Sequence, residues 1–418
     1  MQTLAVVGAS LAGLSAARAA RAGGFDGRLI MIGDEPHRPY DRPPLSKDFL
    51  LGKLTAEDLL LEAEPEELGA EWLLGSGAIG LDAASRTVLL EGGRSVTADG
   101  VVIATGARAR ALPALSGLAN VHTLRSLADA QCLAPTLVAG GRLTVIGAGF
   151  IGAEVASAAV LLGMQVTVID TKPVPFSAAL GAEMGGVMGA LHAANGVELI
   201  SSAVVEGVER SGSRVTAVRL AGGRTVATDV VVVGVGSEPN TEWLEGSGLL
   251  LDRGVLCDPM GRTGVPGIVA VGDCAAWWDE EAGRYCRAEH WTGAFERAAL
   301  AAEVLLDPYA APRPAAPHYF WSEQYGVKLQ FAGHAGGYDR VEVEAGDVQA
   351  HSFLAVYYRA DSPVAVLGMN QPRLFTRRRR VLRVPAPAGA SVHGSPSSSP
   401  ADAPDRSGIL SHAGSTSR

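Results

Sequence analysis

Short runs of consecutive apolar residues recur along the chain, and several of them end at a turn that is rich in glycine. Runs of four or five apolar residues without polar alternation are typical of strands buried on both faces of a parallel sheet. Residues 3–7 and 143–146 are two such runs, and each leads through its turn into a stretch of small residues, 14–22 or 153–162. The pattern predicts two βαβ units. Further predicted strands are residues 29–32, 101–104, 166–169, 230–233 and 268–271, and residues 292–306 are a predicted helix.

The pattern changes near residue 317. Residues 318–367 contain many of the aromatic residues of the chain and alternate between apolar and polar positions, which predicts a small α+β domain. Its predicted strands are residues 327–332, 340–343, 353–358 and 364–367. Residues 385–418 are rich in proline, alanine, serine and glycine and have almost no large apolar residue. We expect this tail to be disordered, because it cannot bury enough surface to offset chain entropy.

Composition narrows the class of protein. The 418 residues are 47% hydrophobic, which is enough for two or three buried cores. A net charge of −9 argues against nucleic acid as a partner. The apolar stretch 11–24 is interrupted by Arg18 and Arg21, which argues against a signal peptide, and no run reaches the roughly 18 residues of a membrane span. We therefore expect a cytoplasmic protein without a membrane span.

The four cysteines offer no redox or metal chemistry by their spacing. Cys132, Cys257, Cys274 and Cys286 form no CxxC pair and match no zinc or iron–sulfur pattern. We expect no metal, and small packing side chains at all four positions. A protein of this sequence has no cysteine pair through which to relay electrons.

The first glycine-rich turn, residues 8–13, follows the dinucleotide fingerprint GxGxxG except that Ser10 stands at the middle position. Gly8 allows the tight turn, Gly13 allows close packing of helix on strand, and the helix N-terminus offers free N–H groups to a phosphate. Asp34, about 20 residues further on, is the candidate acceptor for ribose hydroxyls, with Glu35 as the alternative.

The second turn has all three glycines, Gly147, Gly149 and Gly152, and its acid is Asp170. A carboxylate at this place accepts hydrogen bonds from a ribose and repels a 2′-phosphate, and Lys172 is the nearest cation in the sequence. We therefore expect NADH rather than NADPH. One fingerprint is weak evidence for a ligand, but two, each between an apolar strand and a small-residue helix, indicate two nucleotide cofactors.

Residues 38–47, Arg-Pro-Tyr-Asp-Arg-Pro-Pro-Leu-Ser-Lys, resemble the hallmark loop of the FAD-dependent NAD(P)H–ferredoxin reductases that serve bacterial cytochromes P450 and aromatic-ring dioxygenases. Further matches run in order along residues 3–383: 104–106, 123–125, 147–154, 234–240, 271–274, 320–326, Asn370 and Arg373. The resemblance implies an α/β fold with two Rossmann-like dinucleotide-binding domains, as in glutathione reductase, and a small α+β C-terminal domain. The implied domains are residues 1–108 and 237–317 for FAD, 109–236 for NAD, 318–384 for the C-terminal domain and 385–418 for the tail.

The resemblance also implies binding positions for both cofactors. Those for FAD are Gly8, Ser10, Ala12, Gly13, Asp34, Arg42, Lys47, Ala78, Thr105, Gly106, Arg125, Gly272, Asp273 and Trp291. Those for NAD are Gly147, Gly149, Ile151, Gly152, Asp170 and Gly236. To Asn240, in the same family motif, we assign a structural role in its loop.

Three residues are implied to be catalytic. The resemblance places Lys47 and Glu154 in an ion pair beside N5 of the flavin, where the lysine stabilises the negative charge of the reduced ring. Trp321 is placed near the flavin face opposite the nicotinamide, close to the docked ferredoxin. The alternative for each residue is a position without a catalytic role: a lysine on the surface, a glutamate on a helix and a tryptophan in the core.

The resemblance implies an oxidoreductase that transfers electrons from NADH through FAD to a [2Fe–2S] ferredoxin, as a monomer or weak homodimer. The arginines at residues 377–380, with Arg383, are candidates for steering an acidic ferredoxin, although such a run is also typical of a solvated helix face. Other functions fit the same residues. One is a rubredoxin reductase or NADH oxidase of the same fold, and another is a redox-sensing flavoprotein similar to apoptosis-inducing factor.

Overall fold

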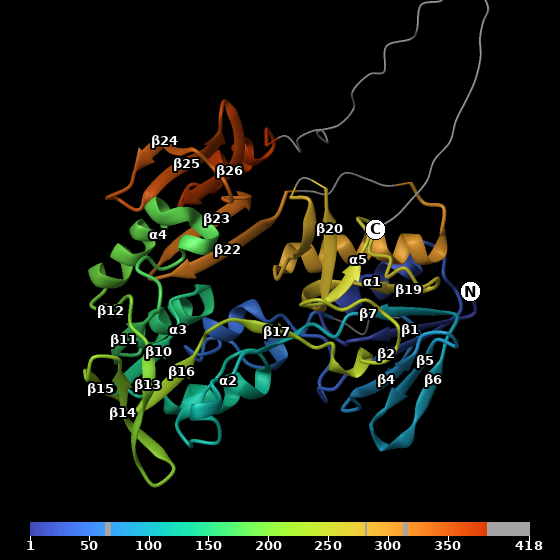
Figure 1. Ribbon diagram of the computed structural model, residues 1–418, viewed down its shortest axis with the longest axis horizontal. Helices are drawn as coiled ribbons and strands as arrows, with labels where there is room; N and C mark the ends of the chain where they lie inside the picture. Colours follow the sequence, from blue (N-terminus) through green and yellow to red (C-terminus); the bar gives the residue numbers. More distant parts are fainter. Residues whose placement is uncertain (63–67, 281, 312–316, 383–418) are drawn as a thin grey trace, which may run out of the picture. The chain divides into compact units, whose positions relative to one another are not determined.

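A computed structural model describes residues 1–62, 68–280, 282–311 and 317–382 (Figure 1). The tail predicted at residues 385–418 lies outside the described residues. Two five-stranded parallel sheets and one five-stranded antiparallel sheet form the cores of what we call the first, second and third domains. Within the described residues, no helix combines the length and the apolar character that crossing a membrane requires.

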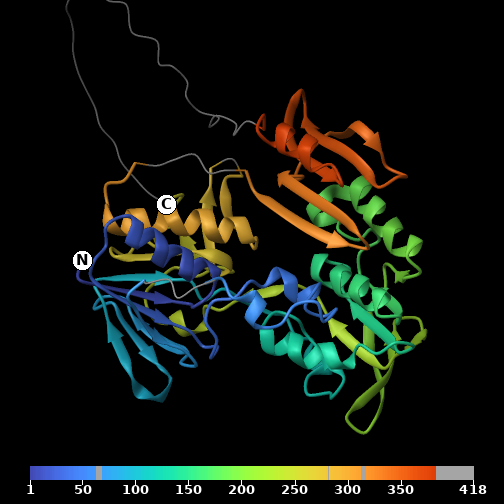
Figure 2. The ribbon, with the colours of Figure 1, turned by 180° about the vertical axis from the view of Figure 1, so that it is seen from behind.

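The first domain is built on the parallel strand order β19-β7-β1-β2-β3. Its strands are β1 (Thr3–Val7), β2 (Arg28–Ile32), β3 (Ala70–Leu73), β7 (Gly100–Ile103) and β19 (Ile268–Ala270). Helices α1 (Leu11–Ala22) and α5 (Trp291–Leu306) lie on one side of this sheet, and the small sheet of β4 (Ala78–Asp82), β5 (Thr87–Leu90) and β6 (Ser95–Thr97) lies on the other (Figure 2). Because both faces are covered, β7 is buried at every residue.

The second domain repeats this plan with the parallel order β12-β11-β10-β16-β9. Its strands are β9 (Val121–His122), β10 (Arg142–Ile146), β11 (Gln165–Ile169), β12 (Glu198–Ile200) and β16 (Val230–Val233). Its helices are α2 (Leu127–Leu133), α3 (Phe150–Leu161) and α4 (Ser177–Ala194), and its antiparallel sheet is β13 (Val205–Ser211), β14 (Arg214–Leu220) and β15 (Thr225–Ala227). The four valines of β16 are all buried, as a strand covered on both faces requires.

The chain passes between the first and second domains twice, and the two crossings pair with each other. Strand β8 (Ala107–Ala109) leaves the first domain and β17 (Ser237–Pro239) returns to it, and the two are antiparallel neighbours. The boundaries predicted after residues 108 and 236 fall within or next to this pair. Strands β18 (Val255–Cys257), β20 (Ala275–Asp279) and β21 (Arg284–Arg287) then form a small sheet before α5.

The third domain is an antiparallel sheet in the order β22-β23-β26-β25-β24. It consists of β22 (Tyr319–Gln324), β23 (Val327–Gly333), β24 (Arg340–Asp347), β25 (Ser352–Arg359) and β26 (Ser362–Met369), followed by α6 (Pro372–Arg379). Alternate residues of β25 belong to different cores. Phe353 and Tyr357 pack in the cluster that contains Leu180 of α4, while Leu354 packs with Phe375 of α6. A hydrogen bond also holds β25 to α4: the Tyr357 hydroxyl donates to the Leu180 carbonyl at 2.7 Å.

The apolar pattern located seven of the ten strands in the two parallel sheets, and residues 3–7 and 230–233 coincide with β1 and β16. Strands β3, β9 and β12 were not predicted. Helices α1 and α3 begin three residues before the predicted starts at 14 and 153, because residues of each fingerprint form the first helical turn. Helix α4 was not predicted, since its sequence is rich in glycine and Gly181 has a left-handed backbone with φ 76°. Strand β22 was not predicted either.

Candidate active site

The first fingerprint turn connects β1 to α1. Gly8 has φ +123°, and a Cβ there would lie 2.0 Å from the Ala104 carbonyl oxygen, so no larger residue fits. A Cβ at Gly13 would lie 1.9 Å from the Gly8 carbonyl oxygen. In the described part of the chain, no side chain caps the N-terminus of α1, and Ser10 instead accepts a hydrogen bond from Arg42 Nε at 3.3 Å. The first N–H groups of α1 are therefore available to an anion.

The second turn connects β10 to α3 in the same way. Gly147 has φ +107°, and its Cβ would lie 2.3 Å from the Gly234 carbonyl oxygen. A Cβ at Gly152 would meet the Gly147 carbonyl oxygen at 2.3 Å, whereas one at Gly149 would meet nothing within 4 Å. That open space beside an uncapped helix terminus is what the close approach of a pyrophosphate needs.

Asp170 and its neighbours surround the second turn. The Asp170 carboxylate accepts hydrogen bonds from the backbone N–H groups of Ala148 and Lys172, both at 2.7 Å, which hold it against the turn. Ile151 is 42% exposed in the first turn of α3, and Gly236 has φ +107° with open space around it. These residues fit one end of a dinucleotide that lies across the carboxyl edge of the sheet.

The two acids at the end of β2 have different environments. Asp34 is exposed and accepts a hydrogen bond from the Glu35 N–H at 2.9 Å. Glu35 is partly buried, pairs with Arg42, and accepts a hydrogen bond from the Tyr40 hydroxyl at 2.6 Å. Burial by itself would raise the pKa of Glu35, but the Arg42 charge and the hydrogen bonds outweigh it and hold the pKa below its ordinary value. Asp34 has the freer carboxylate, and its assignment to the ribose stays a prediction.

The other positions expected to bind FAD converge from four segments of the first domain and its connection. Arg125 pairs with Asp273 and also donates from Nε to the Ala107 carbonyl at 2.9 Å. Gly272 packs directly against Ala12, since an added Cβ would lie 2.9 Å from that side chain. Ala78 begins β4, beside the core of the first domain.

Asn240 connects the two chain crossings. Its side-chain amide donates to the Thr105 carbonyl at 2.9 Å, and the Thr105 hydroxyl donates to the Asn240 carbonyl at 2.7 Å. The neighbouring Gly106 has φ +67° and open space at its Cβ position. This reciprocal contact is a structural role for Asn240, and it fixes the backbone on which Thr105 and Gly106 lie.

Lys47 and Glu154 form an ion pair with 2.7 Å between Nζ and Oε2, and their side chains are 16% and 6% exposed. Glu154 also accepts hydrogen bonds from the Ser46 hydroxyl at 2.5 Å and from the Ser322 hydroxyl at 2.6 Å. Ser46 and Lys47 end the loop at residues 38–47, which contacts the first domain through Arg42 and packs through Tyr40 and Leu45 in the core of the second. Glu154 lies on α3 of the second domain, and Ser322 lies on β22 of the third. One carboxylate thus joins all three domains.

Trp321 lies in a row of aromatic side chains. Its ring meets that of Trp291 edge to face at 6.1 Å, and it stacks on Tyr319 at 6.1 Å. Trp291 donates from Nε1 to Asp41 at 2.8 Å, and Arg379 lies over the Tyr319 ring at 4.5 Å. Burial raises the pKa of Asp41, although the hydrogen bond from Trp291 and the charge of Lys47 act in the opposite direction.

Sequence reasoning missed four polar partners of this site. Ser46 and Asp41 lie inside the loop at residues 38–47, and Ser322 lies beside Trp321. All three are part of motifs that match the family, and this was the sequence signal that could have placed them in the site. Tyr319 precedes that motif and carried no signal. No periodicity in the sequence shows that Ser322 reaches a carboxylate 168 residues earlier.

The expectation that all four cysteines are packing residues is wrong for Cys132, which is exposed. Cys257 and Cys274 are buried and Cys286 is intermediate, and all four are free. Burial raises the pKa of the Cys274 thiol, so it stays protonated.

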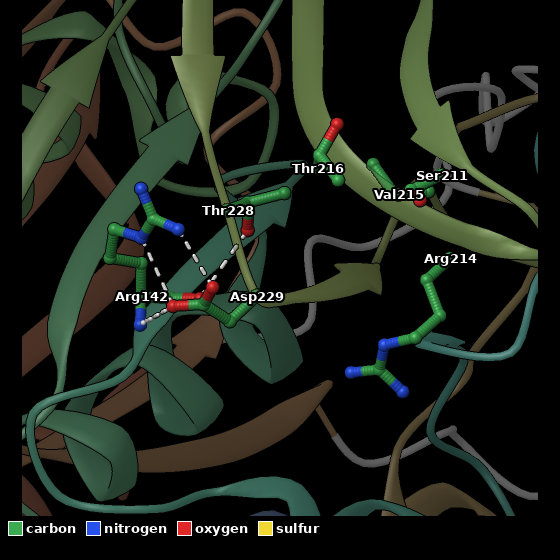
Figure 3. A pocket seen from close by; sticks show the side chains of 7 residues that line it. All are labelled: Arg142, Ser211, Arg214, Val215, Thr216, Thr228 and Asp229. Atoms are coloured by element: carbon green, nitrogen blue, oxygen red, sulfur yellow. Dashed lines mark hydrogen bonds and ion pairs between the residues drawn. The ribbon is translucent and has the colours of Figure 1, made fainter.

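A hollow of ≈ 210 Å³ lies elsewhere in the second domain (Figure 3). Arg142 and Asp229 form an ion pair of 2.7 Å at its side, and Arg214 and Thr216 also line it. Arg142 begins β10, whereas the fingerprint turn follows the end of that strand, about 16 Å away at 3.3 Å per residue. This hollow is therefore separate from the dinucleotide turn.

Known proteins are similar to this chain over most of its length. Residues 2–298 match the pyridine nucleotide-disulphide oxidoreductase family, and residues 319–399 match the reductase C-terminal family. The chain is 36% identical over 386 residues to putidaredoxin reductase of Pseudomonas putida, which covers 90% of each protein. This chain belongs to the pyridine nucleotide-disulphide oxidoreductase family. The predicted resemblance and the class of oxidoreductase are thereby confirmed.

Two further comparisons concern a second relative and a solved structure. The chain is 35% identical to the ferredoxin–NAD(+) reductase component of the biphenyl dioxygenase system of Paraburkholderia xenovorans, over 91% of this chain and 93% of that protein. Its fold matches putidaredoxin reductase in a covalent complex with putidaredoxin, with a TM-score of 0.87 and 35% identity over 91% of this chain and 93% of the other. The predicted fold class is confirmed by this match.

Gly149→Ala and Gly152→Ala are a matched pair of variants at the second turn. The Cβ of Gly152→Ala collides with backbone, so we expect a loss of about 2 kcal/mol or more in the free energy of unfolding, while Gly149→Ala stays within about 0.5 kcal/mol. Gly149→Ala narrows the space for a pyrophosphate, so its Kd for NADH should rise about tenfold or more. Urea denaturation and a binding titration measure both effects. Equal stability losses in the two variants would contradict the geometry.

Ser322→Ala removes one of the three donors to the buried Glu154 carboxylate. A hydrogen bond to a charged group contributes about 1.5–3 kcal/mol, so we expect a loss of that size in the free energy of unfolding. Ser362→Ala, at an exposed position that begins β26, is the control and should change stability by less than about 0.5 kcal/mol. Identical urea midpoints for the two variants would show that Ser322 does not stabilise the domain junction.

Proposed function

We propose that this protein is a ferredoxin reductase that binds FAD in the first domain and NADH in the second. Its electron acceptor is a [2Fe–2S] ferredoxin of a cytochrome P450 or ring-hydroxylating dioxygenase system. The observation that carries the proposal is the Lys47–Glu154 ion pair, which connects the first domain to the fingerprint helix of the second. FAD held by these residues would supply the hydride acceptance and single-electron delivery, to two ferredoxin molecules in turn, that amino-acid side chains do not supply.

The geometry of the first domain supports FAD as the cofactor that stays bound. The uncapped N-terminus of α1 favours a pyrophosphate, and Arg42, beside Ser10, adds a positive charge next to that turn. Asp273 follows β19 and is held by Arg125, so its carboxylate is placed to accept a hydrogen bond from a ribityl hydroxyl. These groups come from separate segments, which suits a large ligand that contacts the domain along its length.

Lys47 supplies positive charge where the first and second domains meet. Its ammonium group has three N–H donors, and two of them are used by Glu154 at 2.7 Å and the Pro43 carbonyl at 2.9 Å. Among the described residues the third donor has no partner, so it is available to a ligand. A fixed ammonium group in a poorly hydrated site stabilises negative charge more strongly than a mobile lysine in water, because it needs no reorganisation.

Glu154 keeps that lysine in place and has capacity for one more donor. An ionised carboxylate offers about four acceptor positions, and Ser46, Lys47 and Ser322 occupy three of them. The remaining position suits the N–H of a nicotinamide carboxamide. Asp170, held against the second turn, favours the two free ribose hydroxyls of NADH over the 2′-phosphate of NADPH.

The third domain supports a protein as electron acceptor. Trp321 and Trp291 lie in contact at the junction of the first and third domains, and Tyr319 extends the row toward the arginines of α6. The two relatives named above are reductases of putidaredoxin and of a dioxygenase-system ferredoxin. The cysteines offer no disulfide relay, because Cys257 and Cys274 are buried and Cys132 and Cys286 are not paired.

Lys47→Ala should slow the reduction of bound FAD by NADH by about 10²-fold, because the variant loses a preorganised positive charge. FAD content should stay unchanged, since many other groups hold that cofactor. Stopped-flow absorbance at the flavin band measures the rate. Lys53→Ala, at an exposed lysine paired with Asp48, is the matched control and should reduce normally. If Lys47→Ala reduced FAD at the unchanged rate, Lys47 would have no role in flavin reduction.

The arginines of α6 contribute unequally to a docking surface. Arg378 pairs with Glu344, and Arg379 covers Tyr319, whereas Arg377 and Arg380 are exposed. The Arg377→Gln/Arg380→Gln variant should raise the KM for an acidic ferredoxin several-fold at low salt and weaken its salt dependence. Arg214→Gln, at an exposed arginine of the second domain, is the control. Retention of the full salt dependence would assign docking to another surface.

One assay separates the proposed function from its alternatives. The FAD-loaded protein is mixed with NADH, a [2Fe–2S] ferredoxin and cytochrome c. Rapid cytochrome c reduction that requires ferredoxin supports the proposal. Oxygen consumption without ferredoxin indicates an oxidase, turnover with rubredoxin alone indicates a rubredoxin reductase, and slow bleaching with a persistent long-wavelength band indicates a redox sensor.

A further inference from the structure

Three side chains that can bind a metal converge away from the Glu154 carboxylate. Asp279 ends β20, His318 immediately precedes β22, and His334 immediately follows β23. Each offers one ligand atom, and the three atoms all lie within 4.8 Å of one another. His334 Nε2 and Asp279 Oδ2 are 3.9 Å apart, and the two imidazole rings meet edge to face at 4.6 Å.

The backbone around these residues is fixed by hydrogen bonds. The Ala282 N–H donates to Asp279 Oδ1 at 2.9 Å, which leaves Oδ2 directed toward His334. The Gly333 N–H donates to the His318 carbonyl at 2.9 Å, so the start of β22 and the end of β23 are held side by side. The His334 N–H donates to the Val364 carbonyl at 3.2 Å. The three ligands therefore come from positions whose main chain is already ordered.

We propose that Asp279, His318 and His334 bind a divalent transition metal ion, with Zn²⁺ as the best match. Two imidazole nitrogens and one carboxylate oxygen, with water in the fourth position, are a common ligand set for tetrahedral zinc. Bonds of about 2.1 Å place tetrahedral ligand atoms about 3.4 Å apart. The His334–Asp279 distance of 3.9 Å is close to that value, and all three ligand atoms lie within 4.8 Å of one another, so side-chain rotations have to bring them closer by at most about 1.4 Å.

The two histidines have no competing hydrogen bond. Within the described residues, the ring nitrogens of His318 form none, and those of His334 have only the 3.9 Å contact with Asp279. Ring nitrogens that no other group engages are free to bind a metal ion.

The charges around the cluster limit its affinity. Arg297 lies over the Trp277 ring at 4.9 Å and acts electrostatically on both His318 and Asp279, so it opposes a dication. Asp279 supplies the negative charge that offsets it in part. With three ligands and an opposing arginine, the expected Kd is in the micromolar range and not the nanomolar range of closed four-ligand sites. His318 also lines a cavity of ≈ 320 Å³ together with His290, so one of the three ligands borders open space.

The ion would connect the small sheet of the first domain to the third domain. Asp279 belongs to the sheet β18-β20-β21, whereas His318 and His334 flank the first two strands of the third domain. His318 lies three residues before Trp321 in the sequence. Zinc would therefore link the start of β22, the strand that carries the aromatic row, to the small sheet of the first domain.

The test is a titration of EDTA-treated, FAD-loaded protein with ZnCl₂. A Cys132→Ala background removes the exposed thiol, which could bind zinc by itself. Isothermal titration calorimetry should give one site with a micromolar Kd, and the melting temperature should rise with ZnCl₂ because the ion binds the folded state. His334→Ala, at a 48% exposed side chain, should weaken binding at least about tenfold and remove the thermal shift without unfolding the protein.

Two further variants make the result specific. Asp279→Asn keeps an oxygen for the Ala282 N–H but removes the charged ligand, so it should also weaken zinc binding. His351→Asn is the matched control, because asparagine tolerates the left-handed backbone found at that position, with φ 50°, and zinc binding should be retained. The proposal is overturned if zinc produces neither heat nor a thermal shift, or if His334→Ala binds zinc as tightly as His351→Asn does.

Discussion

The buried carboxylate of Glu154 constrains the positions of all three domains. Removing an ionised group from water costs several kcal/mol, unless hydrogen-bond donors replace the lost hydration. Ser46 and Lys47 supply two donors from the loop that bridges the first and second domains, and Ser322 supplies one from the third. Charge-assisted hydrogen bonds of this kind weaken when their distances grow, so displacement of either domain by about 1 Å leaves the charge poorly compensated. The proposed catalytic pair is therefore also a packing contact.

The two dinucleotide turns follow the same backbone rule but differ at the middle position. Gly8 and Gly147 have positive φ, and the carbonyl groups of Ala104 and Gly234, at the ends of neighbouring strands, leave no room for a Cβ, so both positions require glycine for two reasons. At the middle position, Ser10 contacts Arg42 in the first turn, whereas Gly149 faces open space in the second. A turn with more polar contacts suits the FAD that we propose stays bound. An open turn suits the NADH that must enter and leave.

The third domain reaches the site through one strand. The β22 sequence alternates, so Phe320 packs in the core shared with α4, while Trp321 turns toward Trp291 and Tyr319. Ser322, on the opposite face from Trp321, reaches Glu154. The proposed zinc ligands flank the other end of this strand. Strand β22 thus connects the polar contact at the domain junction to the aromatic row beside the proposed ferredoxin-docking arginines.

The sequence by itself determined the elements whose signal is local. Uninterrupted apolar runs located β1 and β16, and the glycine spacing located both turns, because strand burial and positive φ restrict residue types at each position. The matched motifs brought Lys47 and Glu154 into consideration together. Only the tertiary structure decided which groups meet them. Ser322 with Glu154, Trp291 with Asp41, and Asp279 with His318 and His334 are pairings of separate segments. Sheet order and register set those contacts, and neither can be read from the pattern of apolar and polar residues in the sequence.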